Sequence, residues 1–216
     1  VTSRLALQHA DSLLGIHLTM LPLRPHLKHE SQKPVSEEEG HWIAKMQKWW
    51  RQEEGYRSIQ STKPMALAFA VMDSPAGLAG WLADKYYRLG DTDKTDTMEG
   101  MIARFPFDTI LAQFSIYWFT GTINSANTLY KAGPAEGSAL LKPGEKVTVP
   151  TAYSEYPIDT LPETPRSWAE RSYNIVRWRM MDRGGHFAAM EEPELFADDV
   201  RDAFREMGVV SGGKRG

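Results

Sequence analysis

The chain has 216 residues, of which 42% are hydrophobic and 25% are charged, and this composition is typical of a globular protein with a sizeable core. The formal net charge of −3 argues against a nucleic-acid binder, which would normally present a basic face. Cysteine is absent, which excludes a disulfide framework, a thiolate metal site and a thiol nucleophile. The sequence shows neither an apolar run of the roughly 20 residues that a membrane span needs nor a signal-peptide pattern, and we expect a cytoplasmic protein.

A helix and a strand are predicted at the start of the chain. Residues 2–10 are good helix formers, and residues 16–23 alternate well enough for a buried strand that Pro22 and Pro25 end. A helix followed by a β-rich run is half of a β–α–β unit, for which a parallel sheet is the default expectation. Residues 24–35 are rich in Pro, His, Lys and Ser and are predicted to form a linker.

A block of helices is predicted after the linker. Ser36 and Glu39 form a capping-box pattern at the start of its first helix, which Gly55 is expected to end. Further helices are predicted at 64–72, 75–89, 108–119 and 122–131, with an exposed charged loop at 90–98. Because residues 108–119 are almost wholly apolar after their cap, we expect that helix to be buried on most sides.

The chain returns to strand-forming sequence after a Gly/Pro loop. That loop covers 133–144, strands are predicted at 146–152 and 174–181, a short helix at 165–171, an amphipathic helix at 193–207 and a polar tail at 211–216. This order predicts an α/β sheet protein that is interrupted by an all-helical cap. The sheet domain would comprise 1–33 and 133–216, and the cap would comprise 34–132.

His186 stands out among the six histidines. It follows two glycines, which permit a sharp turn, and it lies directly after a predicted strand, where functional groups of sheet enzymes gather. The other five are assigned no chemistry, since His9 and His41 are expected on helix surfaces, His17 in a structural position inside a strand, and His26 and His29 in the linker. No pair has a carboxylate partner at metal-ligand spacing, so no metal site is predicted.

A candidate acid precedes His186 in the chain. Asp159 lies in the loop after the strand at 146–152, so both groups would lie at the same edge of a parallel sheet. Acid before histidine is the chain order of α/β-hydrolase triads. Glu155 and Glu163 compete for the same role, and position alone favours Asp159 only slightly.

Several segments resemble one enzyme family. Residues 183–199 (RGGHFAAMEEPELFADD) resemble the carboxyl-terminal signature of the microsomal-type epoxide hydrolases, which have the α/β-hydrolase fold. Residues 55–64 (GYRSIQSTKP) with 73–81 (DSPAGLAGW), and residues 117–130 (YWFTGTINSANTLY), are similar to two segments of that family's cap. Residues 156–159 (YPID) resemble its stretch with the triad acid. The chain would thus be the carboxyl-terminal part of an α/β-hydrolase core with an inserted helical cap.

The resemblance implies roles for four residues. His186 would be the general base, and Asp159 would orient it and stabilise its charge. Tyr56 and Tyr130 would be the two cap tyrosines that hold the epoxide oxygen and donate its proton. Without the resemblance, Tyr56 would be an ordinary turn residue and Tyr130 an ordinary aromatic near a helix end.

Five further aromatic residues are assigned to packing. Tyr117 and Trp118 are expected in the core or in the wall of a pocket, and Trp42, Trp49 and Trp50 in the packing of the cap rather than in substrate contacts.

The implied reaction turns a lipophilic epoxide into a vicinal diol. A carboxylate opens the strained ring and becomes an ester, the two phenols protonate the developing oxyanion, and a water activated by histidine hydrolyses the ester. The ligands implied are the epoxide and water, without cofactor, metal, nucleic acid or membrane segment, and a homo-oligomer stays open.

The nucleophile has no candidate in the sequence. Asp11 and Asp73 lie in predicted turns without the strand–Gly pattern of a nucleophile elbow, and aligning residues 5–18 with the family's next helix and strand places that elbow a few residues before Val1. We therefore expect the carboxyl-terminal part of a longer enzyme, inactive by itself. The alternatives are a haloalkane dehalogenase or an esterase of the same fold, against which the paired tyrosines argue, and a non-catalytic binding module.

Overall fold

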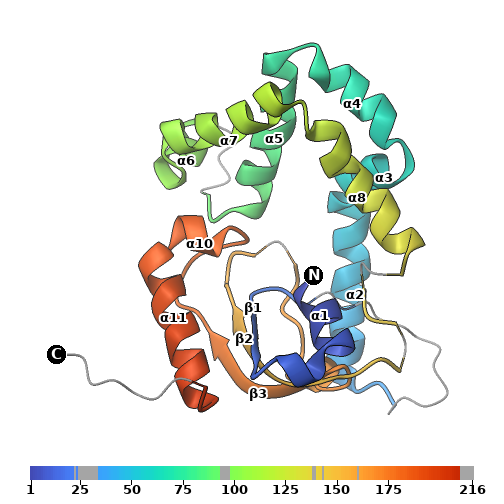
Figure 1. Ribbon diagram of the computed structural model, residues 1–216, viewed down its shortest axis with the longest axis vertical. Helices are drawn as coiled ribbons and strands as arrows, with labels where there is room; N and C mark the ends of the chain where they lie inside the picture. The colour runs from blue at the N-terminus through green and yellow to red at the C-terminus, as the bar shows by residue number, and fades with distance from the viewer. Residues whose placement is uncertain are drawn as a thin grey trace.

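The structure is a computed structural model that describes residues 1–21, 23, 34–92, 98–137, 140–142, 144–159 and 161–209. A small parallel sheet forms one end of the molecule, and an arch of helices stands over it (Figure 1). The predicted fold class, a sheet domain with an inserted helical cap, is confirmed. The linker residues 24–33, with His26 and His29, and the tail at 211–216 lie outside the described residues.

The sheet of the described residues consists of three parallel strands in the order β1-β2-β3, namely β1 (Ile16–Leu18), β2 (Val147–Glu155) and β3 (Tyr173–Met180). Ile16 pairs with Thr151, and Thr151 pairs in turn with Ile175. The first strand is shorter than the predicted 16–23. The helix α1 (Thr2–Gln8) and the short 3-10 turn η1 (Ala10–Ser12) precede it.

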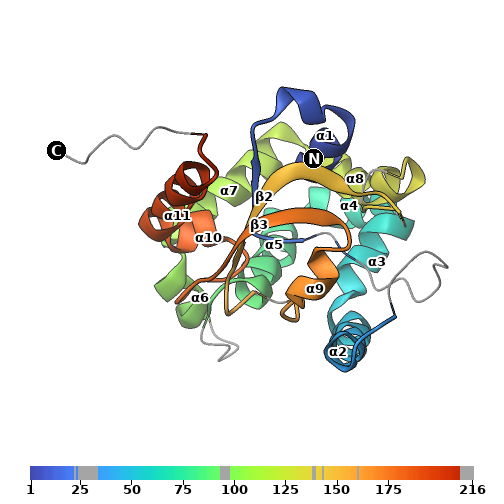
Figure 2. The same ribbon diagram turned by 90° about the horizontal axis from the view of Figure 1, so that it is seen from below.

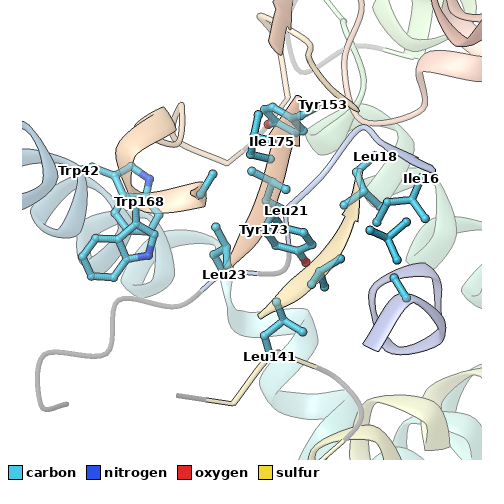
Figure 3. Packing of buried hydrophobic residues seen from close by; sticks show 14 of the residues in the cluster. Ile16, Leu18, Leu21, Leu23, Trp42, Leu141, Tyr153, Trp168, Tyr173 and Ile175 are labelled. Atoms are coloured by element: carbon cyan, nitrogen blue, oxygen red, sulfur yellow. The ribbon is translucent and has the colours of Figure 1, made fainter. Parts of the chain in front are cut away.

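The main core packs around this sheet, and α2 (Glu37–Glu53) contributes to it (Figure 3). Trp42 is 3% exposed and packs at 5.2 Å, between ring centroids, against Trp168 of α9 (Arg166–Ala169). Each large apolar side chain buried in this way stabilises the fold by about 1.5–3 kcal/mol. Trp42 therefore belongs to the core of the sheet, and its assignment to cap packing is wrong.

The capping box of α2 is present as predicted. The Ser36 backbone N–H donates to Glu39 Oε2 at 2.9 Å, and the Glu39 N–H donates to the Ser36 hydroxyl at 3.2 Å. Gly55 does not end this region, because Glu54 closes α2 and Gly55 is the first residue of the next helix.

The rest of the cap is helical throughout. Its elements are α3 (Gly55–Thr62), α4 (Pro64–Met72), α5 (Pro75–Leu89), α6 (Met98–Arg104), α7 (Phe107–Thr120) and α8 (Ile123–Ala135). Proline stands at the first position of α4 and α5, as predicted, because its missing N–H costs nothing there. The sequence pattern missed α6, and α8 continues through Pro134 into the segment predicted as a loop.

Two predictions of exposure are wrong. Ile110 is the buried residue of α7, whereas Leu111, Ile116 and Phe119 are 49%, 56% and 83% exposed, since α7 lies at the edge of the cap and packs along one stripe against α5. In the loop predicted at 90–98, residues 93–97 lie outside the described residues, and the described residue Thr92 is 7% exposed. That loop carries contacts between the cap and the segment after β3, as shown below.

The last helices flank the sheet. α10 (Ala188–Glu191) is a short turn that the sequence pattern missed, and α11 (Pro193–Glu206) lies on the side of the sheet away from α2 (Figures 1 and 2). Asp199 of α11 is fully buried and accepts hydrogen bonds from Ser154 and, at 2.7 Å, from Arg177. His17 lies 3.1 Å from the same carboxylate, and its predicted structural position inside a strand is confirmed.

Candidate active site

His186 lies in the loop that leaves β3 and faces the cap. Its backbone N–H donates to the carbonyl oxygen of Leu89, the last residue of α5, at 3.1 Å. Gly184 has a φ of 101°, a conformation that side chains disfavour. At Gly185 a Cβ would lie 2.7 Å from the backbone nitrogen of Asp91, so the cap packs too closely for any side chain. The two glycines thus allow the histidine loop to touch the cap.

The carboxylate of Glu191 holds this loop in place, a role that sequence reasoning missed. The carboxylate accepts hydrogen bonds from the backbone N–H groups of Gly185 at 2.9 Å, Phe187 at 2.8 Å and Asp91 at 2.8 Å. Its side chain is fully buried, and the Arg104 guanidinium lies 3.5 Å away. One buried charge therefore joins the histidine loop to the cap. The next residue, Glu192, is also a glutamate, so the local sequence does not indicate which of the two is buried.

The structure brings His186 and Asp159 together. His186 Nδ1 lies 3.2 Å from Asp159 Oδ1, and the side chains are 30% and 13% exposed. Burial lowers the pKa of His186, but the hydrogen bond and the charge of Asp159 outweigh it, so that the pKa is raised above its usual 6.5. Because Nδ1 faces the carboxylate, the tautomer with its proton on Nδ1 leaves Nε2 as the basic atom.

Glu155 and Glu163, the two alternatives for the acid that pairs with His186, lie in different surroundings. Glu155 is 6% exposed at the end of β2 and accepts a hydrogen bond from the Thr164 N–H at 3.1 Å. Burial raises the pKa of Glu155 to about 7. Glu163 lies with Glu155 along a separate hollow beside α2. The acid within hydrogen-bonding distance of His186 is Asp159.

Tyr56 and Tyr130 come together from different cap helices. Tyr56 is in the first turn of α3 and Tyr130 is in the middle of α8, and their rings meet edge to face with 6.1 Å between centroids. Burial, with a further contribution from Tyr130, raises the pKa of Tyr56 to about 12, and burial also raises the pKa of Tyr130. Both phenols therefore keep their protons at neutral pH and can donate them in hydrogen bonds.

Two cavities meet at these three side chains. A cavity of about 390 Å³ and another of about 240 Å³ are each lined by Tyr56, Tyr130 and His186. Apolar side chains form most of the larger wall, including Leu21, Trp42, Met46, Trp49, Trp50 and Leu161. Aromatic and amide side chains line the smaller cavity, including Gln60, Trp81, Gln113, Phe114, Tyr117 and Asn127. A ligand at the tyrosines could thus extend in two directions.

The other aromatic residues and histidines singled out in the sequence lie partly in the cavity walls and partly elsewhere. Tyr117 lies in a cavity wall and Trp118 packs in the core of the cap, as expected. Trp49 and Trp50 line the larger cavity, which the sequence pattern did not predict. His9 and His41 are exposed as predicted.

The described residues include neither a metal-binding cluster nor a membrane-spanning helix. That part of the chain holds no group of three or more His, Cys, Asp or Glu side chains that could bind a metal ion. None of the helices described in the structure is long and apolar enough to cross a bilayer.

Known proteins with similar sequences were identified by comparison. No protein-family model matches the chain. Epoxide hydrolase 1 of Sus scrofa is 40% identical over 152 residues, which are 69% of this chain and 33% of that protein. A relative from Stigmatella aurantiaca, named for the same activity, is 33% identical over 208 residues, which are 96% of this chain and 44% of the relative.

Solved structures give the same result. The juvenile hormone epoxide hydrolase of Bombyx mori superposes with a TM-score of 0.79 at 26% identity, over 95% of this chain and 52% of that one. The Aspergillus niger epoxide hydrolase gives a TM-score of 0.72 at 27% identity. The chain spans less than half the length of the curated relatives it matches. By sequence and fold, the chain therefore corresponds to part of the epoxide hydrolases of the α/β-hydrolase fold.

Proposed function

We propose that the protein containing this chain hydrolyses a lipophilic epoxide to a vicinal diol. The observation that carries the proposal is the convergence of His186, held by Asp159, and the two phenols of Tyr56 and Tyr130 on the same pair of cavities. The largely apolar wall of the larger cavity suits a lipophilic substituent, because burying it there removes apolar surface from water.

The first step opens the ring. A carboxylate oxygen attacks an epoxide carbon, the C–O bond breaks, and an ester and an alkoxide form. A phenol of Tyr56 or Tyr130 gives its proton to the alkoxide and becomes a phenolate, while the second phenol donates a hydrogen bond to the same oxygen. Removing one such donor from an oxyanion site typically costs about 2.7–4 kcal/mol of activation free energy. The tyrosines also favour this reaction over dehalogenation, since a departing halide needs no proton.

The second step breaks the ester. His186 Nε2 takes a proton from water as the water oxygen attacks the ester carbonyl, and Asp159 stabilises the imidazolium. The second proton of that water passes from the new carboxylic acid to the departing alkoxide, so that the diol leaves and the carboxylate is restored, and the histidine proton returns to the phenolate. Every proton is thus accounted for by the chain's own residues and water.

The nucleophile comes from elsewhere. Among the described residues, those that line the two cavities include no Asp or Glu. We propose that the attacking carboxylate belongs to a part of the protein outside these 216 residues. The 216-residue chain by itself should then show no hydrolysis.

The test uses the protein at the length that its gene encodes. Replacing both tyrosines, Tyr56→Phe with Tyr130→Phe, should lower kcat/KM for styrene-type epoxides by at least about 10³-fold, as gas chromatography of the diol would measure. A matched control is Tyr87→Phe, because Tyr87 lies on α5 and lines neither cavity. Unchanged turnover in the double variant would refute the assigned roles.

A further inference from the structure

Asn127 is an unusual residue in the cap. It lies on α8, one turn before Tyr130, and it is 0% exposed. Neither its amide nitrogen nor its amide oxygen has a hydrogen-bond partner among the described residues. A buried amide without partners destabilises a protein, and native structures rarely contain one without a reason such as a bound ligand or water.

The amide lies in the wall of the smaller cavity. This cavity of about 240 Å³ has Tyr56, Tyr130 and His186 at its border with the larger one, and Asn127 lines it together with Gln60 and Gln113. Residues three apart on a helix lie on the same face, so Asn127 and Tyr130 present their side chains to one ligand path. Space of this size can hold several water molecules or a short substituent.

The chemistry of the two cavities differs. The larger cavity is walled mostly by aliphatic and indole side chains, whereas the smaller one adds three side-chain amides and the Lys85 ammonium group to its aromatic walls. An asparagine amide offers both a donor and an acceptor. Its best complement is a group that also offers both, and a carboxamide does so with the same planar shape.

We propose that the smaller cavity is a polar subsite, in which Asn127 binds a hydrogen-bonding end group, of the carboxamide class, on one substituent of the epoxide. This rests on the proposed function, because the epoxide itself must sit between Tyr56 and Tyr130. The apolar substituent then occupies the larger cavity. The favoured substrates carry one lipophilic arm and one short arm that ends in a donor–acceptor group.

The test compares two epoxides of equal shape. The first is 5,6-epoxyhexanamide and the second is 1,2-epoxy-6-methylheptane, in which an isopropyl group replaces the carboxamide. Their kcat/KM ratio is measured with the protein at its gene-encoded length, and their Kd ratio with the 216-residue chain by quenching of tryptophan fluorescence, to which Trp81 of this cavity contributes. Further pairs of epoxides, with an arm one methylene shorter or longer, show which arm length reaches Asn127.

The decisive variant is Asn127→Leu, which keeps the volume and removes the polar atoms. It should lower the ratio of carboxamide to isopropyl kcat/KM by about tenfold or more, because only the carboxamide loses a hydrogen-bond partner. The matched control is Asn124→Leu, one turn earlier on α8 and outside both cavity walls, and it should change neither ratio. Asn127→Ala serves as a second variant if the leucine perturbs folding.

The outcomes are distinct. An unchanged ratio in both Asn127 variants would overturn the subsite. It would show that the Asn127 amide binds an internal water molecule only. Turnover of the isopropyl epoxide with no preference for the carboxamide would reject the subsite while the proposed function stands. If neither epoxide nor a styrene-type epoxide is hydrolysed, the proposed function fails, and the Kd ratio still decides whether Asn127 binds the carboxamide.

Discussion

His186 and the two tyrosines reach the same cavities from regions that the chain holds in different ways. Backbone N–H groups around the histidine loop converge on the buried carboxylate of Glu191, and the cap backbone at Asp91 packs directly on Gly185. Tyr56 and Tyr130 are instead held by the packing of α3 against α8 and by contact between their rings. Polar geometry tolerates little change, whereas side-chain packing can adjust, so substitutions in the two regions should differ in cost.

The largest loss of stability is expected from Glu191→Gln. The variant replaces a charged acceptor of three backbone N–H groups by an amide that offers one acceptor oxygen and places a donor against another donor. The free energy of unfolding should fall by about 3 kcal/mol in urea denaturation. Glu194→Gln on the exposed first turn of α11 is the control and should change it by less than about 0.5 kcal/mol.

A smaller loss is expected from Gly185→Ala. The added Cβ would lie 2.7 Å from the Asp91 nitrogen and 3.1 Å from the Leu89 oxygen, both backbone atoms that cannot turn away. Stability should fall by about 1–3 kcal/mol. Gly80→Ala on α5 meets nothing within 4 Å and should instead stabilise the helix by about 0.5–1 kcal/mol. Equal effects of the two substitutions would contradict the tight contact between loop and cap.

Asp159→Asn should mainly change the pKa of His186. Without the carboxylate, burial dominates, and the pKa of His186 should fall, as NMR of the imidazole protons would show. The wild-type pair stabilises the fold fully below the ordinary pKa of histidine and loses this contribution as the pH rises through the raised pKa of His186. The stability difference between wild type and variant should therefore shrink from acid to alkaline pH, and a constant difference would speak against the pairing.

The smallest change in stability is expected from Tyr56→Phe and Tyr130→Phe. Neither hydroxyl is hydrogen-bonded to another residue in the part of the chain that the structure describes, and the rings remain in place. Each variant should alter the free energy of unfolding by less than about 0.5 kcal/mol. A loss comparable to that of Glu191→Gln would show that the tyrosines are held by polar contacts after all.

The sequence predicted those features that depend on near neighbours. Ser36 and Glu39 mark a helix start because a capping box needs two residues three apart, and the starts at Pro64 and Pro75 follow equally local rules. The pairing of His186 with Asp159 could also be predicted, since both residues lie where parallel strands end.

Other features depend on tertiary packing and gave no local signal. Glu191 is buried while Glu192 is not, although they are adjacent, and Asn127 is enclosed only because side chains of α3, α5, α7 and α8 meet around it. The exposure of α7 was mispredicted for the same reason, because an apolar helix at the edge of a cap has the sequence of a buried one. The roles of the four site residues and the cytoplasmic location stay predictions.

We propose that His186 serves the second of two chemical steps, at a site that it shares with the tyrosines. Intact-mass spectrometry of the His186→Gln variant, made at its gene-encoded length and incubated with a styrene-type epoxide, tests it most directly. The protein should gain the mass of one substrate molecule, because the ester forms and cannot be hydrolysed, and Tyr56→Phe with Tyr130→Phe should abolish this gain. Continued turnover without any added mass in the His186→Gln variant would contradict the claim.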